Sequence, residues 1–171
     1  MLGLTPRAMI ELQPETPRQH ADAIEALYDR TFGPGHFAKT AERLREGNTS
    51  LPDLARIGLY QGAVIAVCRL WPILVGAERV PAVFVGPVAV DPAFQGERLG
   101  LSVTEAALDA ATEAGWGSAI IIGAPSYFEA LGFTVVAPDR FQFPGPQDMS
   151  RVMIRALAGD PDALRGRLIP A

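Results

Sequence analysis

Cysteine and histidine are scarce in this sequence, and positive charge is not concentrated anywhere. Cys68 is the single cysteine among 171 residues, so an internal disulfide is excluded and the composition suits a reducing cytosol. Lys and Arg total 15 against 19 Asp and Glu, which gives a formal net charge of -4. The basic residues form no stripe of the kind that neutralises phosphates along a duplex. We therefore expect no nucleic-acid partner.

Long apolar runs are also missing. No segment approaches the roughly 20 apolar residues that cross a bilayer, and Arg7 and Glu11 interrupt any basic-then-apolar secretory pattern near the start. We expect a cytoplasmic protein without a membrane partner. The balance of 49% hydrophobic and 20% charged residues is that of a globular domain, and the length fits one. We place this domain at residues 8–158, with 159–171 as a tail or last edge strand.

The hydrophobic pattern predicts one continuous succession of strands and helices. Strands are expected near residues 8–12, 54–60, 63–71, 81–90, 120–122, 133–136 and 151–157, and helices over 16–33, 37–47, 99–114 and 125–131. Thr16-Pro17-Arg18-Gln19 predicts a helix start with a reciprocal capping box between Thr16 and Gln19. Gln61-Gly62 predicts a tight hairpin. Gly86-Pro87 predicts a bulge or a departure from regular pairing, because proline has no N–H to donate to a sheet.

The stretch from Asp91 to Gly100, between a predicted strand and a predicted helix, is the candidate for chemistry. A helix N-terminus presents unpaired N–H groups and a partial positive charge, so a glycine-bearing turn that leads into one can hold a pyrophosphate. Gly96 and Gly100 would let the backbone approach such a ligand. The same glycines are also explained by turn geometry alone. Both interpretations stay open on spacing.

Three segments together resemble the signature of the GCN5-related N-acetyltransferase (GNAT) superfamily, nearest to the bacterial predicted acetyltransferases typified by YhbS. They are Val85-Gly86-Pro87-Val88-Ala89-Val90-Asp91-Pro92, the loop Gln95 to Gly100, and Pro125-Ser126-Tyr127-Phe128-Glu129-Ala130-Leu131-Gly132-Phe133. The resemblance implies an α/β fold with a mixed sheet of about seven strands and about four helices. It also implies that this sheet splays open between its fourth and fifth strands, with acetyl-CoA in the gap as co-substrate.

By the same resemblance, the family's cofactor contacts fall on named positions. The pantetheine would pair with the backbone of Val88, Ala89 and Val90. The pyrophosphate would be held by N–H groups of the loop and helix start, and α-helical residues near the end of the signature would complete the site. The remaining cofactor-binding candidates are Gln95, Gly96, Glu97, Arg98, Leu99, Gly100, Leu101, Ser126 and Phe128.

The sequence departs from the family pattern at two of these positions. Arg98 stands where the loop has a glycine, and its side chain would either hinder cofactor binding, if the site needs positive φ, or bind a phosphate. Phe128 stands where many members have the tyrosine that protonates the departing CoA thiolate. Tyr127 is adjacent and is the candidate acid, although one position turns a helical side chain by about 100 degrees.

The general base and the acceptor are less defined. The strand 82–90 has no carboxylate, so His36 is the first candidate base, with Glu42 and Glu78 as alternatives. Four arginines, which could recognise an anionic acceptor or simply be solvated, are Arg43, Arg45, Arg56 and Arg69. We expect an N-acetyltransferase acting on an unknown amine of a small molecule or protein, as a monomer or homodimer. The alternative is a weakened or inactive module of the same fold that binds acyl-CoA or another protein.

Overall fold

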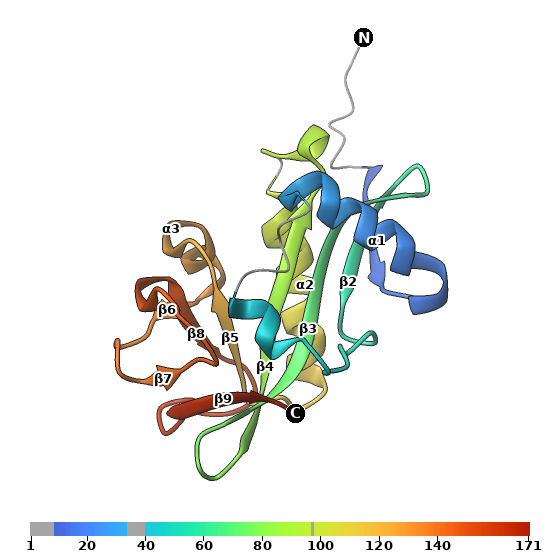
Figure 1. Ribbon diagram of the computed structural model, residues 1–171. Coiled ribbons are helices and arrows are strands. Elements are labelled where there is room, and N and C mark those ends of the chain that lie inside the picture. Colours follow the sequence, from blue (N-terminus) through green and yellow to red (C-terminus); the bar gives the residue numbers. More distant parts are fainter. Residues whose placement is uncertain (1–8, 34–39, 97) are drawn as a thin grey trace.

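The computed structural model describes residues 9–33, 40–96 and 98–171. Its centre is a mixed β-sheet with the order β1-β2-β3-β4-β5-β8-β6 (Figure 1). These strands are β1 (Glu11–Pro14), β2 (Arg56–Tyr60), β3 (Ala63–Val75), β4 (Val80–Val90), β5 (Ser118–Ile122), β8 (Val152–Ala156) and β6 (Thr134–Val135). Off this path, β7 (Phe141–Gln142) pairs with β9 (Gly166–Pro170), and β9 also pairs with β3. The predicted mixed sheet is confirmed.

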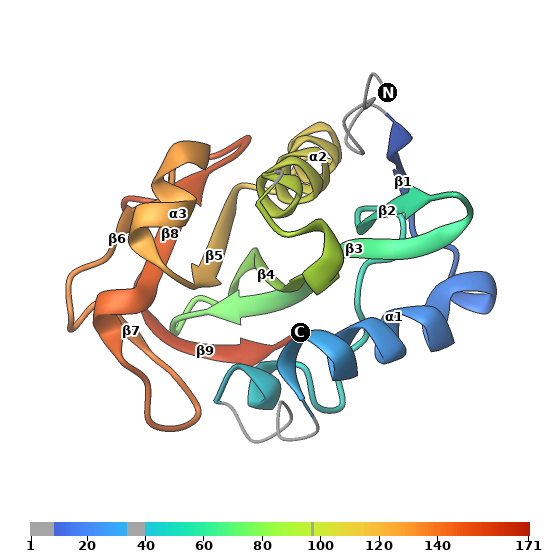
Figure 2. The same ribbon diagram turned by 90° about the horizontal axis from the view of Figure 1, so that it is seen from above.

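Helices cover both faces of the sheet (Figure 2). α1 (Pro17–Phe32) lies on one face, α2 (Leu99–Glu113) lies on the other, and α3 (Pro125–Phe128) follows β5. Short 3-10 helices are η3 (Thr40–Leu44), η4 (Pro92–Phe94), η5 (Glu129–Leu131) and η6 (Met149–Arg151). The helix expected at 37–47 is described from residue 40 onward, as η3. None of the described helices has the length and apolar character to span a bilayer.

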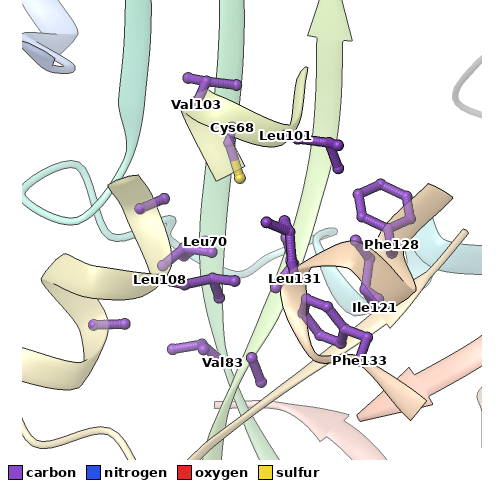
Figure 3. Packing of buried hydrophobic residues seen from close by; sticks show 14 of the residues in the cluster. Cys68, Leu70, Val83, Leu101, Val103, Leu108, Ile121, Phe128, Leu131 and Phe133 are labelled. Atoms are coloured by element: carbon purple, nitrogen blue, oxygen red, sulfur yellow. The ribbon is translucent and has the colours of Figure 1, made fainter. Parts of the chain in front are cut away.

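Each layer of helices buries a separate apolar cluster against the sheet. On the α1 side, Ile24 and Leu27 are fully buried among residues of β2, β3 and β4. On the α2 side, Leu108 packs with Leu70 and Val83 (Figure 3). Each fully buried side chain of this size contributes about 1.5–3 kcal/mol relative to exposure. The two layers therefore hold β3 and β4 between them.

The start of α1 shows one correction to the sequence prediction. Thr16 is the N-cap and Pro17 the first helical residue, as predicted, but the capping box with Gln19 is wrong. The Thr16 side chain makes no capping hydrogen bond, and the Thr16 backbone N–H donates to Nδ1 of His20 at 2.9 Å. His20 lies one helical turn along and is buried. Its imidazole therefore accepts the bond that Gln19 was expected to accept.

The predicted hairpin at Gln61-Gly62 joins β2 to β3. Both residues have positive φ, 50° at Gln61 and 81° at Gly62. Positive φ at both central positions is the pattern of a type I′ turn, whose twist matches that of the paired strands. The long β3 that follows is the strand on which β2, β4 and β9 assemble.

β4 contains a β-bulge at Gly86-Pro87, as the sequence predicts. Leu70 of β3 pairs with Val85, and Cys68 pairs with Val88, so three steps along β4 match two along β3. One extra residue reverses the alternation of side chains along a strand. Val85 and Val88 consequently pack on the same side, with the cluster under α2.

The C-terminal residues belong to the same core as the rest. β9 pairs with β3 between Ile73 and Val75, and Leu164 and Leu168 are buried with Ile73. The chain thus returns to the sheet at the end of β3 that pairs with the start of β4. The division of the chain at residue 158 stays a prediction.

Candidate functional site

The sheet opens between β4 and β5 just beyond the bulge (Figure 1). β4 pairs with β5 only at Val83–Val85, whereas its pairing with β3 continues to Val90. The two strands then diverge toward the start of α2 and toward α3. A cavity of about 460 Å³ lies in this opening. The predicted cofactor residues that line it are Val88, Val90, Gln95, Gly96, Arg98, Leu99, Gly100 and Phe128.

Alternation along β4 decides which backbone groups face the opening. The N–H of Asp91 donates to the carbonyl of Ile65 on β3 at 2.8 Å. In an extended strand, successive residues direct their backbone groups to opposite sides. Val90 and Val88 therefore direct theirs away from β3 and toward the gap, whereas Ala89 bonds to β3. The side chain of Ala89 is buried in the α1 cluster and does not line the cavity.

Side chains from α1 and the loop fix the end of β4. Arg30 donates to Asp91 Oδ2 from Nε and Nη2, at 3.2 and 3.1 Å. Thr31 Oγ1 and Gln95 Nε2 both donate to the Val90 carbonyl, at 3.4 and 3.3 Å. These contacts hold the loop that leads from β4 into α2, and they direct Gln95 back toward the opening.

The N-terminus of α2 forms the far wall of the cavity. The hydrogen bond from Ser102 N–H to the Arg98 carbonyl, at 3.1 Å, spans the first turn, so the N–H groups before it have no acceptor within the helix. The Leu101 N–H donates to the Tyr127 hydroxyl, and burial raises the pKa of Tyr127. A Cβ at Gly100 would overlap this hydroxyl oxygen. Glycine at position 100 thus lets Tyr127 lie directly over the helix start.

Arg98 adopts the backbone conformation that a glycine would supply. It is the N-cap of α2 with φ 56° and ψ 23°, in the left-handed region. Its side chain is exposed, and the residue lines the cavity next to Gly96, whose φ is 93°. The family resemblance raised the question whether this position needs positive φ. The structure has positive φ here, and the arginine itself adopts it.

Phe128 closes the inner end of the cavity. It is buried on α3 beside Leu101 and Ile121 (Figure 3). Its ring centroid lies 4.9 Å from that of Tyr127, edge to face. Ser126 is exposed and does not line the cavity. The two adjacent aromatic residues therefore differ in direction: Tyr127 extends to α2, and Phe128 packs into the core.

A second cavity continues the opening past Phe128 toward η3 and β8. It measures about 260 Å³ and shares Phe32, Val88 and Phe128 with the first cavity. Its walls are mostly apolar and include the bulge itself. Arg45 and Arg151 are the charged residues of this lining within the described part of the chain. The two cavities together lead from the α2 N-terminus through the bulge to the other side of the sheet.

The structure separates the four arginines considered from the sequence. Arg43 and Arg56 donate to backbone carbonyls at 2.7 and 2.9 Å. Arg69 forms a two-point salt bridge with Glu15, at 2.8 and 3.1 Å. Arg45 alone of the four lines the second cavity. Sequence reasoning missed Arg151, which ends η6 far along the chain, because no motif marks it.

The candidate bases are placed unequally. Glu42 lies beside Arg45 and lines a small adjoining cavity of about 70 Å³ near Pro87. Glu78 precedes β4, and the six residue steps from Val80 to Gly86 span about 20 Å at 3.3 Å per step, so Glu78 is remote from the opening. His36 and the cofactor candidate Glu97 lie outside the described residues.

Neither a cysteine nucleophile nor a metal centre emerges from the described residues. Cys68 is fully buried on β3, and burial raises the pKa of its thiol to about 12. The thiolate is the reactive form, so Cys68 is a core residue, as predicted. No group of three or more His, Cys, Asp or Glu side chains is arranged to hold a metal ion in the part of the chain that the structure describes.

Known proteins share this arrangement. The uncharacterized N-acetyltransferase YhbS of Escherichia coli strain K12 is 29% identical over 150 residues, which cover 85% of this chain and 86% of that protein. The structure of Escherichia coli YhbS in complex with CoA is similar with a TM-score of 0.79 and 25% identity, over 95% of this chain and 90% of that one. A GNAT family acetyltransferase from Brucella melitensis, solved with acetyl-CoA, has the same fold, with a TM-score of 0.71, 21% identity and coverage of 95% and 96%.

The strongest assignment comes from the family model. The model described as the Acetyltransferase (GNAT) family matches residues 21–133, a range that includes most of α1 and all of the bulge, the 91–100 loop, α2 and α3. This range covers most of the chain and every element around the opening. The protein therefore belongs to the GNAT acetyltransferases, whose co-substrate is acetyl-CoA.

Proposed function

We propose that the protein transfers an acetyl group from acetyl-CoA directly to an amine, with both substrates bound at once. The observation that carries this proposal is the opening of the sheet at the bulge, with a helix N-terminus at one end and a second cavity at the other. The complex of Escherichia coli YhbS with CoA supports the same assignment of the first cavity.

The cofactor would lie along the first cavity. Its pyrophosphate would accept hydrogen bonds at the start of α2, where Leu99 and Gly100 present N–H groups and the helix dipole is positive. Its pantetheine would run along β4, where Val88 and Val90 direct backbone groups into the gap. The thioester would then reach the bulge, where the two cavities meet beside Val88 and Phe128.

The transfer needs little covalent chemistry from the protein. The neutral amine attacks the thioester carbonyl, the C–N bond forms, the C–S bond breaks, and the amine proton leaves to a base or to water. Backbone N–H groups of β4 would polarise the carbonyl, and alignment of the two substrates would supply much of the rate. Cys68 is too deeply buried to form an acyl intermediate.

The missing family tyrosine at Phe128 weakens one step but leaves a route open. A thiol has a pKa near 8.5, so CoA can depart as thiolate near neutral pH with less need of an acid than an alcohol would have. Tyr127 stays the candidate acid, because it lines the cofactor cavity and a phenol is protonated near neutral pH. His36 stays the first candidate base.

A binding module without activity is the second candidate function. It is favoured by Phe128, which stands at the position of the family's tyrosine and cannot donate a proton. Such a protein would bind acetyl-CoA in the same cavity and release no CoA.

Two measurements test the proposal in sequence. Calorimetric titration with acetyl-CoA should show saturable binding, with a matching rise in melting temperature. Release of free thiol should then depend on an added amine. Absence of binding at millimolar acetyl-CoA would contradict both functions, whereas binding without thiol release over a broad amine panel would leave only the binding module.

A further inference from the structure

Arg45 occupies an unusual place for an arginine, at the point where the sheet opens. Its side chain is 12% exposed and lies against Phe84, with the guanidinium carbon 5.5 Å from the ring centroid. A Cβ on Gly86 would lie 3.2 Å from Arg45 Nη2. The cation therefore rests on the bulge itself, inside the opening between β4 and β5.

The partners of Arg45 leave part of its guanidinium unused. Nη1 donates to Glu42 Oε2 at 3.2 Å. Nε is buried and has no hydrogen-bond acceptor among the described residues. Burial is also the main reason why the pKa of Arg45 is lowered. Nε itself is enclosed, so an anion would meet the guanidinium through its outer nitrogens at the cavity wall, where a charge-assisted hydrogen bond would stabilise it.

The rest of the second cavity fits such an anion on a small molecule. Arg151 lines the wall on the β8 side, and no acidic residue lines the cavity within the described residues. The other walls are apolar, among them Phe84, Ile121 and Phe128. At about 260 Å³, the space is slightly smaller than the roughly 300–1,000 Å³ of sites for drug-sized ligands.

We propose that the second cavity is the acceptor subsite and that it selects a small amine with an anionic group, carboxylate or phosphate, on an apolar body. This inference rests on the proposed function. The anionic group would lie between Arg45 and Arg151, and the amine would extend toward the bulge, where the cavity meets the cofactor cavity.

The positive charges of Arg45 and Arg151 also affect the protonation of the acceptor amine, for which strand β4 supplies no carboxylate base. An amine must be neutral to attack, and nearby positive charges favour the neutral form over the ammonium. With its anionic end held by the two arginines, the acceptor places its amine in a cavity without a carboxylate in the described lining. A lower amine pKa reduces the need for a strand carboxylate, because more of the acceptor is already neutral when it binds and its ammonium proton has gone to water.

Paired substrates test the selectivity. Thiol release from acetyl-CoA is measured for each member of a pair. One set compares L-leucine, L-methionine and L-phenylalanine with their C-terminal amides. The other set compares phosphoethanolamine with ethanolamine. We expect kcat/KM at least about tenfold higher for the anionic member of a pair, the equivalent of one charge-assisted hydrogen bond. The two sets separate carboxylate from phosphate. Equal or better use of the amides and of ethanolamine would overturn the proposal.

A binding measurement keeps this test separate from the test of catalysis. N-acetyl-L-leucine, N-acetyl-L-leucinamide, phosphoethanolamine and ethanolamine are titrated into the protein by calorimetry, without acetyl-CoA. Preferential binding of an anionic ligand supports the subsite even if no transfer is seen. No binding of either anionic ligand, at concentrations where acetyl-CoA stabilises the protein, would overturn the subsite while leaving the proposed function intact.

Variants then assign the selectivity to Arg45. Arg45→Gln should remove most of the preference, whereas Arg43→Gln, a matched control whose side chain bonds a backbone carbonyl outside the cavity, should keep it. Glu42→Gln removes the competing carboxylate and should tighten binding of the preferred anion threefold or more. If Arg45→Gln fails to fold, the Glu42→Gln variant still tests the assignment of the selectivity to Arg45. An unchanged preference in Arg45→Gln, or no gain in Glu42→Gln, would contradict the assignment.

Discussion

Replacement of Arg98 by glycine separates the backbone role of this residue from its charge. Arg98 has φ 56° at the N-cap of α2, and a side chain in the left-handed region costs roughly 1–2 kcal/mol. Glycine removes that cost but loses about 0.5–1 kcal/mol through the greater freedom of the unfolded chain. The net expectation is a stabilisation of about 0.5–1 kcal/mol, equivalent to roughly 1–4 °C in melting temperature for a chain of this size.

The same substitution should weaken acetyl-CoA binding, although it stabilises the fold. Because the arginine already adopts the glycine-like backbone, the substitution gains little in loop geometry and loses a cation that lines the cofactor cavity. An exposed contact of this kind is worth about 0.5–1 kcal/mol. Arg98→Gly should therefore bind acetyl-CoA roughly two- to fivefold more weakly, and this difference should shrink in about 1 M salt, where the Debye length is near 3 Å.

Arg79 provides a matched control. It is also an arginine in the left-handed region, with φ 54°, in the turn before β4 at the end remote from the opening. Arg79→Gly should raise the melting temperature by a similar amount and leave the acetyl-CoA affinity unchanged. Calorimetry and thermal melts on the two variants suffice. Tighter binding by Arg98→Gly would refute this reasoning and show that the arginine hinders the loop.

Three other predictions concern Phe128, Gly100 and Cys68. Phe128→Tyr restores the family's hydroxyl and should raise kcat of amine-dependent thiol release by at least about tenfold if acid catalysis is limiting; an unchanged kcat at full stability would exclude that limitation. Gly100→Ala should displace the Tyr127 hydroxyl and weaken acetyl-CoA binding, and combination with Tyr127→Phe should recover part of the loss in a double-mutant cycle. Cys68, with its thiol pKa raised to about 12, should resist iodoacetamide at pH 8 in the folded protein and react fully in denaturant; rapid labelling of folded protein would contradict its placement in the core.

Local signals predicted the elements around the opening well. The paired positive-φ turn at Gln61-Gly62, the bulge at Gly86-Pro87 and the start of α1 at Pro17 all follow from residues a few positions apart. The capping box failed for a similar local reason, because Gln19 and His20 compete for one N–H. The buried imidazole of His20, one turn along, accepts the hydrogen bond from the Thr16 N–H.

Contacts between distant segments could not be predicted in this way. Arg45 and Arg151 are more than a hundred residues apart, and only the return of the chain through η6 and β8 brings both to the second cavity. Likewise, the sequence gives no sign that the Tyr127 hydroxyl meets the Leu101 N–H. Such pairings depend on the packing of whole elements and leave no periodic trace.

The bulge also sets which face of the sheet each half of β4 serves. Because it adds a single residue to β4 relative to β3, the count of residues, and not their chemistry, places Val88 on the α2 side and Ala89 on the α1 side. If β4 kept its length but paired with β3 without the bulge, Val88 would lie opposite Val67 and these two faces would be exchanged. That register would turn the side chains of Val88 and Val90 toward α1 and their backbone groups toward β3 instead of toward the gap. The groups that face the opening are thus set by the register of one strand pair.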